Sequence, residues 1–157
     1  MGSGPRRDRL TVIPSPDARN SLVLWHKTVA PIKVLRNGLF IMLARHSPSL
    51  AVKRALYRLI GMQVGDHVSF AWQVTPDLFF PELIRVGDNT IIGYNTTILA
   101  HEYLLTEWRT GPVVIGGNVT IGANCTLLPG IVIGDGATVS AMSLVNKDVP
   151  PGAKVGG

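Results

Sequence analysis

A single histidine, His101, stands where a regular apolar stretch of the sequence breaks off, within residues 98–103. A neutral imidazole near pH 7 can remove a proton from a hydroxyl group in a transition state, which suits a general base. Glu102 or Glu107 lies close enough along the chain to fix the tautomer of the ring. His101 is therefore a candidate for a catalytic base. The alternative is a histidine exposed on a loop.

Three more side chains are suited to binding a substrate that carries hydroxyl groups. Asp77 and Glu82 lie in a proline-bounded segment, residues 76–83, and their carboxylates could accept a hydrogen bond from a hydroxyl. Trp108 follows His101 in the next irregular segment and could line the same pocket. We predict that Asp77, Glu82 and Trp108 bind the substrate. The alternative is that these segments form contacts between subunits.

A six-residue repeat must position these side chains. One aliphatic residue recurs at every sixth place: Ile115, Ile121, Leu127, Ile133, Val139 and Val145. The same phase occurs upstream in residues 64–75 and 86–97. An α-helix would space apolar residues three and four apart, and a single strand two apart. A period of six with frequent glycines instead indicates short strands joined by tight corners and stacked into a solenoid.

The repeat loses its phase twice, between Pro76 and Arg85 and between Glu102 and Val114. Interruptions of a solenoid protrude as loops, and such loops gather on a binding face. The regular corners contain Gly, Asn and Asp, as in residues 116–118 and 134–136, because these residues tolerate positive φ. The two interruptions are therefore where we expect the chemistry.

This pattern resembles the hexapeptide-repeat acyltransferases, and in particular the maltose and galactoside O-acetyltransferases and the xenobiotic acetyltransferases. The resemblance rests on the hexads and on His101, which precedes an irregular loop and then the motif of residues 114–122. It implies a mainly β fold, a left-handed parallel β-helix of about five coils with an N-terminal α-helical appendage. It also implies a homotrimer that transfers an acetyl group from acetyl-CoA to a hydroxyl of a sugar or another small hydrophilic acceptor, with His101 as the general base.

The resemblance also assigns residues to the cofactor site. The family positions that contact acetyl-CoA correspond to Ala123, Ala141, Asn146 and Lys147. Small side chains would let a pantetheine arm approach backbone amides, and Lys147 offers a charge for phosphate. The alternative is that the two alanines only turn corners and that Lys147 is a solvated side chain.

Charge divides the 157 residues into unequal parts. Residues 1–60 carry eleven Lys and Arg against two Asp, a formal charge of +9, whereas residues 61–157 carry four bases against eight acids, or −4. We expect a flexible basic tail over residues 1–20, a helical segment over 21–62 and the acyltransferase domain over 63–157. Within the helical segment, helices are predicted over residues 21–46 and 48–60, each with an apolar stripe.

The two helices admit more than one role. The second helix directly precedes the first coil and could cap its open end; its bases Lys53, Arg54 and Arg58 lie mostly away from its apolar stripe. Apolar stripes with interleaved bases are also typical of helices at a membrane surface, so residues 21–60 could make a peripheral membrane contact. No recognised motif supports nucleic-acid binding beyond the bulk charge.

The only cysteine, Cys125, occupies an inward position of a hexad, so we predict a buried thiol and no intrachain disulfide. A reducing, cytoplasmic location fits, since no signal peptide or bilayer-spanning run is visible.

Two rival functions remain for such a scaffold. A γ-class carbonic anhydrase would need three histidines on zinc, whereas only His67 and His101 lie within the coils, so we expect no metal. The second rival is a non-catalytic scaffold or regulatory subunit that docks through its basic helices and does not bind acetyl-CoA.

Overall fold

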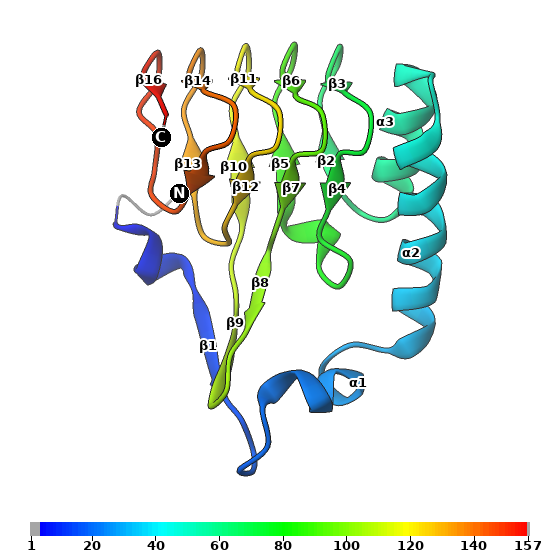
Figure 1. Ribbon diagram of the computed structural model, residues 1–157, viewed down its shortest axis with the longest axis vertical. Helices are drawn as coiled ribbons and strands as arrows, with labels where there is room; N and C mark the ends of the chain where they lie inside the picture. The colour runs from blue at the N-terminus through cyan, green and yellow to red at the C-terminus, as the bar shows by residue number, and fades with distance from the viewer. Residues whose placement is uncertain (1–3, 157) are drawn as a thin grey trace.

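The computed structural model describes residues 4–156, and most of its strands belong to three parallel sheets that enclose an apolar core. The first sheet contains β2 (Gln63–Val64), β5 (Ile84–Val86), β10 (Val113–Ile115) and β13 (Val132–Ile133). The second contains β3 (Ser69–Phe70), β6 (Ile91–Ile92), β11 (Thr120–Ile121), β14 (Thr138–Val139) and β16 (Lys154–Val155). The third contains β4 (Thr75–Pro76), β7 (Thr97–Ile98), β12 (Thr126–Leu127) and β15 (Leu144–Val145). Figure 1 shows the resulting row of stacked coils, which confirms the prediction of a mainly β fold with parallel sheets.

The hexad pattern has a direct structural cause. The aliphatic residues that recur every six places, such as Ile121 and Leu127, are fully buried in the core between the three sheets. Cys125 is buried among them, as predicted. The corners use residues that accept positive φ: Asn89, Asn95, Asn118 and Asn124 all have φ of 54–55°. Asparagines of neighbouring coils also bond to each other, Asn89 Nδ2 to Asn118 Oδ1 at 2.7 Å and Asn95 Nδ2 to Asn124 Oδ1 at 3.0 Å.

Both interruptions of the repeat leave the stack at one edge. The strands β4, β7, β12 and β15 pair in register, Pro76 with Ile98, Ile98 with Leu127, and Leu127 with Val145. The segments that follow these strands are therefore neighbours, and we call them the loop edge (residues 77–83, 99–112, 128–131 and 146–148). The first interruption contains the short helix η3 (Pro81–Leu83). The second is a hairpin of β8 (His101–Tyr103) and β9 (Glu107–Thr110).

The N-terminal residues differ from the expected flexible tail. Residues 6–9 form the short helix η1 (Arg6–Arg9), and β1 (Thr11–Pro14) adds to the hairpin as an antiparallel strand beside β9. Arg6 Nε donates to Pro129 O at 2.6 Å and Arg9 Nε to Gly130 O at 2.8 Å, so the segment is fixed to the loop edge. The sequence pattern missed this because the partners lie more than 100 residues away. Residues 1–3 of the expected tail lie outside the described part.

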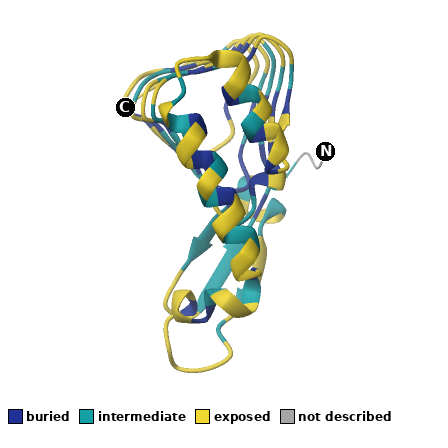
Figure 2. Ribbon diagram, turned by 90° about the vertical axis from the view of Figure 1, so that its right-hand side faces the viewer, coloured by how far each residue is buried: buried dark blue, intermediate teal, exposed yellow. Residues whose placement is uncertain are grey.

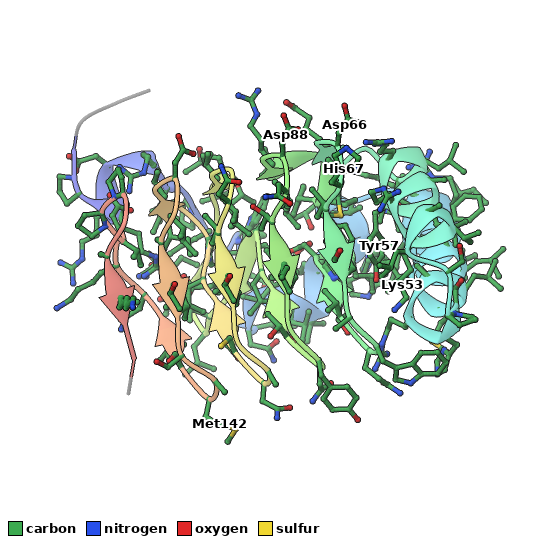
Figure 3. The ribbon with its side chains drawn as sticks, turned by 90° about the horizontal axis from the view of Figure 1, so that it is seen from above. Lys53, Tyr57, Asp66, His67, Asp88 and Met142 are labelled. Carbon is green, nitrogen blue, oxygen red and sulfur yellow. The ribbon has the colours of Figure 1, made fainter. Side chains whose placement is uncertain are left out.

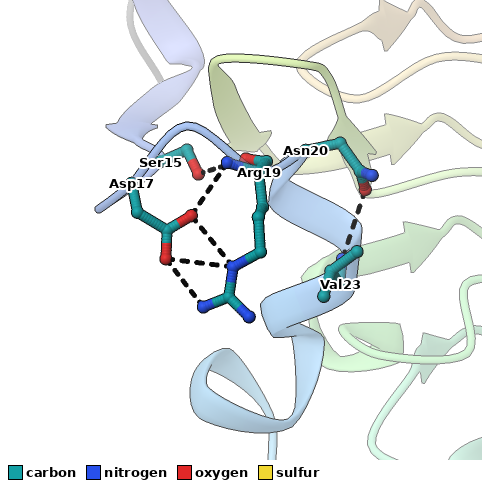
Figure 4. Close-up of polar contacts among 5 residues, drawn as sticks. All are labelled: Ser15, Asp17, Arg19, Asn20 and Val23. Atoms are coloured by element: carbon teal, nitrogen blue, oxygen red, sulfur yellow. Dashed lines mark hydrogen bonds and ion pairs between the residues drawn. The ribbon is translucent and has the colours of Figure 1, made fainter.

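A polar turn carries the chain from β1 to the helices (Figure 4). The guanidinium of Arg19 donates to both carboxylate oxygens of Asp17, and Ser15 Oγ donates to Arg19 O at 3.0 Å. The hydrogen bonds from Arg19 lower the pKa of Asp17 to about 2. Asn20 Oδ1 then accepts from Val23 N at 3.3 Å and caps η2 (Ser21–Leu24), which leads into α1 (Trp25–Thr28).

Two helices, α2 (Pro31–His46) and α3 (Leu50–Leu59), form a layer across the end of the stack next to the first coil, β2 to β4 (Figure 1). Helix α3 faces this coil with its polar side chains, and Lys53 and Tyr57 lie between the two (Figure 3). Its donors satisfy backbone carbonyls of the coil: Lys53 to Ala71 O (2.9 Å), Arg54 to Val68 O (3.1 Å), Tyr57 to Val74 O (2.7 Å), and Arg58 to Val64 O and Gly65 O (both 2.9 Å).

The side of α3 that faces the coil is therefore the side of its bases and not that of its apolar stripe. An open end of a β-solenoid presents unpaired carbonyl groups, so it favours hydrogen-bond donors over aliphatic side chains. Apolar residues of the predicted stripes, such as Leu35 and Leu59, point outward instead. Among residues 4–156, none of the helices combines the length and the apolar character that a membrane span requires.

Candidate functional site

A hydrogen-bonded pair of side chains on the loop edge, Asp77 and His101, joins two neighbouring coils. Asp77 directly follows β4, and His101 begins β8 shortly after β7, so the register of β4 with β7 brings them together. His101 Nδ1 lies 2.6 Å from Asp77 Oδ2. The same oxygen accepts from Ala100 N at 2.6 Å, and Asp77 Oδ1 accepts from the amides of Phe79 and Phe80 at 2.8 Å. The Asp77 carboxylate thus has four donors, and its side chain is 0% exposed.

These contacts set the protonation of the pair. Burial alone would raise the pKa of the Asp77 carboxyl, but the hydrogen bond and the charge of His101, with the amides of Phe80 and Ala100, hold that pKa below its usual value. An ionised carboxylate can only accept, so Nδ1 of His101 carries the proton. In the neutral ring Nε2 is then the free acceptor, the nitrogen that can take a proton from a ligand. The ring is 15% exposed and lies outside the apolar core.

The carboxylate that orients His101 was not found from the sequence. Glu102 or Glu107 was expected in this role, but Glu102 pairs with Arg6 at 3.0 Å and Glu107 accepts from Arg109 Nε at 2.7 Å. Asp77 takes the position because it lies one coil away at the matching corner, although it is 24 residues distant in sequence. Counting hexads from Pro76 to Ile98 would have revealed this alignment.

The three residues expected to bind substrate occupy different places. Asp77 has no free oxygen to offer to an acceptor, because it is buried and fully hydrogen-bonded to this chain; assigning it to the acceptor was wrong. Glu82 is exposed and pairs with Lys33 at 2.7 Å, outside the contacts of His101. Trp108 is part of the aromatic surroundings of His101.

An aromatic cluster surrounds the imidazole on several sides. The ring centroids of Phe79, Tyr103 and Phe80 lie 4.8, 5.2 and 5.9 Å from that of His101. Trp108 stacks on both Phe80 and Tyr103 at 5.8 Å. Trp25 stacks on Phe79 at 5.8 Å. Such rings exclude water and present flat apolar surfaces beside the base.

Two members of this surrounding come from the helical segment and were missed by the sequence analysis. Trp25 belongs to α1, and Thr28 at the end of α1 bonds through Oγ1 to the hydroxyl of Tyr103 at 2.6 Å. Burial raises the pKa of Tyr103, so its hydroxyl stays protonated near neutral pH. No periodic signal links α1 with the hairpin, because the two meet only through the fold.

The residues expected to bind the cofactor fall on two edges of the stack. Ala123 and Ala141 occupy equivalent corners of adjacent coils, next to Met142, whose amide donates to Ala123 O at 2.9 Å. Figure 3 shows Met142 on the edge opposite to the corner of Asp66 and Asp88. Asn146 and Lys147 instead belong to the loop edge, two coils from Ala100 by the pairing of β7, β12 and β15.

Metal-ligand chemistry was also considered. Within the described residues, no group of three or more His, Cys, Asp or Glu side chains comes together as a metal site. His67 is exposed at a corner with φ of 56°, and it lies between β2 and β3, a different edge from that of His101, which follows β7.

Stacked hexad coils with an oriented histidine on the loop edge define a β-solenoid with a candidate catalytic site. The family model described as "Bacterial transferase hexapeptide (six repeats)" matches residues 112–147. YvoF of Bacillus subtilis (strain 168), whose name gives it provisionally as an acetyltransferase, is 59% identical over 137 residues, 85% of this chain and 80% of that protein. A provisionally named acetyltransferase of Staphylococcus aureus (strain MRSA252) is 47% identical over 130 residues, 81% of each chain. The chain therefore belongs to the hexapeptide-repeat transferase family.

Solved structures agree with this family. A hexapeptide-repeat acetyltransferase from Vibrio cholerae, complexed with acetyl coenzyme A, superposes with a TM-score of 0.67 and 26% identity, covering 80% of this chain and 82% of that one. A galactoside acetyltransferase in complex with coenzyme A gives a TM-score of 0.62 and 25% identity, covering 81% and 77%. The prediction that the chain is an enzyme of the acetyltransferase class is confirmed.

Proposed function

We propose that this enzyme transfers an acetyl group from acetyl-CoA to a hydroxyl of a sugar or another small hydrophilic acceptor, with His101 as the general base. The observation that carries the proposal is the bond between Asp77 and His101, because it leaves Nε2 free to accept a proton. Nε2 takes the hydroxyl proton while the oxygen attacks the thioester carbonyl carbon. The C–S bond then breaks, and the proton on the ring passes to the departing thiolate.

The acceptor class rests on the surroundings of the base. Flat aromatic faces beside a proton acceptor suit a molecule with an apolar ring surface and hydroxyl edges, as sugars have. Relatives named for galactoside acetylation are consistent with this choice. Glu82, in the first interruption, and Trp108, in the second, remain our candidates for contacting the acceptor.

The donor site in this proposal uses two edges of the stack. Ala123 and Ala141 on one edge and Asn146 and Lys147 on the other could meet one acetyl-CoA molecule where two copies of the chain lie side by side. We therefore propose a homotrimer of left-handed β-helices with about five coils each, located in the cytoplasm. Residues 63–157 would be the catalytic domain and residues 21–62 its helical appendage.

The decisive experiment replaces the base and measures thiol release from acetyl-CoA over a panel of sugars and other hydroxyl acceptors. His101→Ala is expected to lower kcat by roughly 10²- to 10⁴-fold while equilibrium binding of acetyl-CoA is retained. His46→Ala is the matched control, because His46 is exposed on α2, hydrogen-bonds to Met42 O of its own helix and contacts Trp72, which is not part of the aromatic cluster around His101. Turnover of His101→Ala at the wild-type rate would refute the mechanism, and a wild-type chain that does not bind acetyl-CoA would favour the scaffold alternative.

A further inference from the structure

The N-terminal segment and the last corner of the loop edge enclose a cavity of about 520 Å³. Its lining residues come from the two ends of the chain: Pro5, Arg6, Arg7, Asn146, Lys147 and Asp148. Three of these six side chains are cationic. Residues 1–20 were expected to form a flexible basic tail, so this juxtaposition of the two ends of the chain comes from the fold alone.

The charges that line the cavity are not balanced within the chain. The carboxylate of Asp148 is already engaged, because it pairs with Arg9 and accepts from Val132 N at 2.9 Å. Arg6 is held by Glu102 and by Pro129 O. Arg7 and Lys147 are exposed, and in the described residues neither has a carboxylate within ion-pair distance. An arginine fork beside a lysine charge is a favourable arrangement for a phosphate group.

We propose that this cavity binds the 3′-phosphate of CoA, so that Arg7 of the N-terminal segment and Lys147 together form part of the donor site. The inference rests on the proposed function. Lys147 stands two coils from the start of the His101 loop, roughly 10 Å along the stack. The 3′-phosphate is the terminal dianion of CoA and lies at the end of the molecule away from the thioester that must reach His101.

The test compares acetyl-CoA with acetyl-dephospho-CoA, which lacks only the 3′-phosphate. The wild type is expected to favour acetyl-CoA by about tenfold or more in kcat/KM, since hydrogen bonds to charged groups contribute about 1.5–3 kcal/mol. In Arg7→Ala/Lys147→Ala the preference should fall to about twofold or less. Arg19→Ala, whose arginine is exposed and pairs with Asp17, is the control and should keep the wild-type preference.

The outcomes separate the two proposals. If the double variant keeps the full preference, the phosphate site is wrong even though the transferase activity stands. If the wild type turns over neither donor, calorimetric binding of CoA and dephospho-CoA to the same variants still tests the cavity. If the wild type binds CoA and dephospho-CoA equally well, the proposal that the cavity binds the 3′-phosphate is overturned.

An independent observation concerns the outer face of the helix layer. Ile32 and Leu35 on α2 are 74% and 71% exposed. Leu39, Met42, Leu43, Val52 and Leu59 are also exposed, and Figure 2 views this side of the molecule with its two largely exposed helices. Soluble monomers seldom expose apolar side chains in such continuity, so this face is suited to contact something.

Charge indicates the kind of contact. Residues 20–65 contain seven Lys and Arg and no Asp or Glu. Lys33 pairs with Glu82, and Arg45 donates to Gln73 of the first coil. Lys53, Arg54 and Arg58 also face that coil, so the exposed bases left to flank the apolar face are Lys27 and Arg36. A second copy of the same face would oppose like charges, which costs free energy. We propose that the outer face of α2 and α3 binds an anionic lipid surface, as interfacial helices with basic flanks do.

Sedimentation with vesicles tests this face. The full chain should bind vesicles of phosphatidylcholine with about one third phosphatidylserine, lose at least tenfold in affinity in Leu35→Glu/Leu39→Glu, and bind weakly to pure phosphatidylcholine. Leu105→Glu, at an exposed position on the hairpin, is the matched control. Equal binding of wild type and double variant would contradict the proposal. So would a wild type that ignores vesicles but self-associates through this face in sedimentation velocity.

Discussion

Asp77 Oδ2 and His101 Nδ1 lie 2.6 Å apart and connect two successive coils of the stack. The orientation of the candidate base is therefore set by the spacing of the repeat and not by its own hairpin. The partner amides of Asp77 come from both coils as well, Phe79 and Phe80 from one and Ala100 from the next. A site built this way is rigid on the side of the coils, while its aromatic walls come from the first interruption (Phe79 and Phe80), the hairpin (Tyr103 and Trp108) and α1 (Trp25).

Asp77→Asn should reduce kcat by roughly 10²- to 10⁴-fold. The amide of Asn offers one acceptor oxygen where the carboxylate serves donors on two, so the ring loses its fixed tautomer or Ala100 N loses its acceptor. Steady-state kinetics with saturating acetyl-CoA measure the effect. A variant with unchanged kcat and an intact fold would show that Asp77 does not orient the base.

Glu102→Gln should keep kcat within about threefold, because Glu102 bonds to Arg6 and not to His101. This variant distinguishes the structural assignment from the one expected from sequence proximity. The same kinetic assay decides between them: a loss as large as that of Asp77→Asn would return the orienting role to Glu102.

The lowered pKa of Asp77 predicts a dependence of stability on pH. A carboxyl whose pKa is lower in the folded than in the unfolded state contributes stability that is present above its unfolded value near 3.8 and is lost as the pH falls through the folded value. The free energy of unfolding of the wild type should therefore drop more steeply below about pH 4 than that of Asp77→Asn. Urea denaturation at pH 7 and at successively more acidic pH measures the two slopes, and parallel curves would contradict the assignment.

Tyr57→Phe should destabilise the protein by about 1–3 kcal/mol, because it leaves the buried Val74 carbonyl without its donor. Burial raises the pKa of Tyr57, so the hydroxyl remains a donor over the whole neutral range. Urea denaturation at neutral pH measures the change. Tyr94→Phe removes a hydroxyl from an exposed corner and should stay within about 0.5 kcal/mol; similar losses in both variants would argue against the capping role of α3.

A pair of glycine substitutions tests the close approach of the coils. A Cβ at Gly93 would lie 2.5 Å from Gly122 C and 2.7 Å from Ala123 N, both backbone atoms that cannot move aside, so Gly93→Ala should cost at least about 2 kcal/mol. At Gly38, within α2, the nearest atom to a Cβ is a Leu78 side-chain carbon at 3.7 Å, so Gly38→Ala should stabilise by about 0.5–1 kcal/mol. Thermal unfolding of the two variants should move in opposite directions.

The repeat and its buried positions could be predicted from the sequence, whereas contacts between residues far apart in the chain could not. Hexads predicted the parallel sheets and their buried positions, including Cys125, because each repeat specifies its own coil. The interruptions located His101, but the partner of its ring needed the register of two coils. Helical spacing shows which residues share one face of a helix, but it does not show whether that face contacts the coil or the solvent. The exposure of apolar residues such as Leu35 and Leu59 could therefore not be predicted. The carbonyl groups of the first coil decided which face contacts it.

The bond between Arg9 and Asp148 has a consequence for how this solenoid comes apart. In a linear array of repeats each unit holds only its neighbours, so the terminal units can fray one at a time. Here a strap from residues 6–9 reaches the region of the last coils. The array is thereby tied back on itself, and melting that starts at the C-terminal end cannot pass Asp148 until the strap is released.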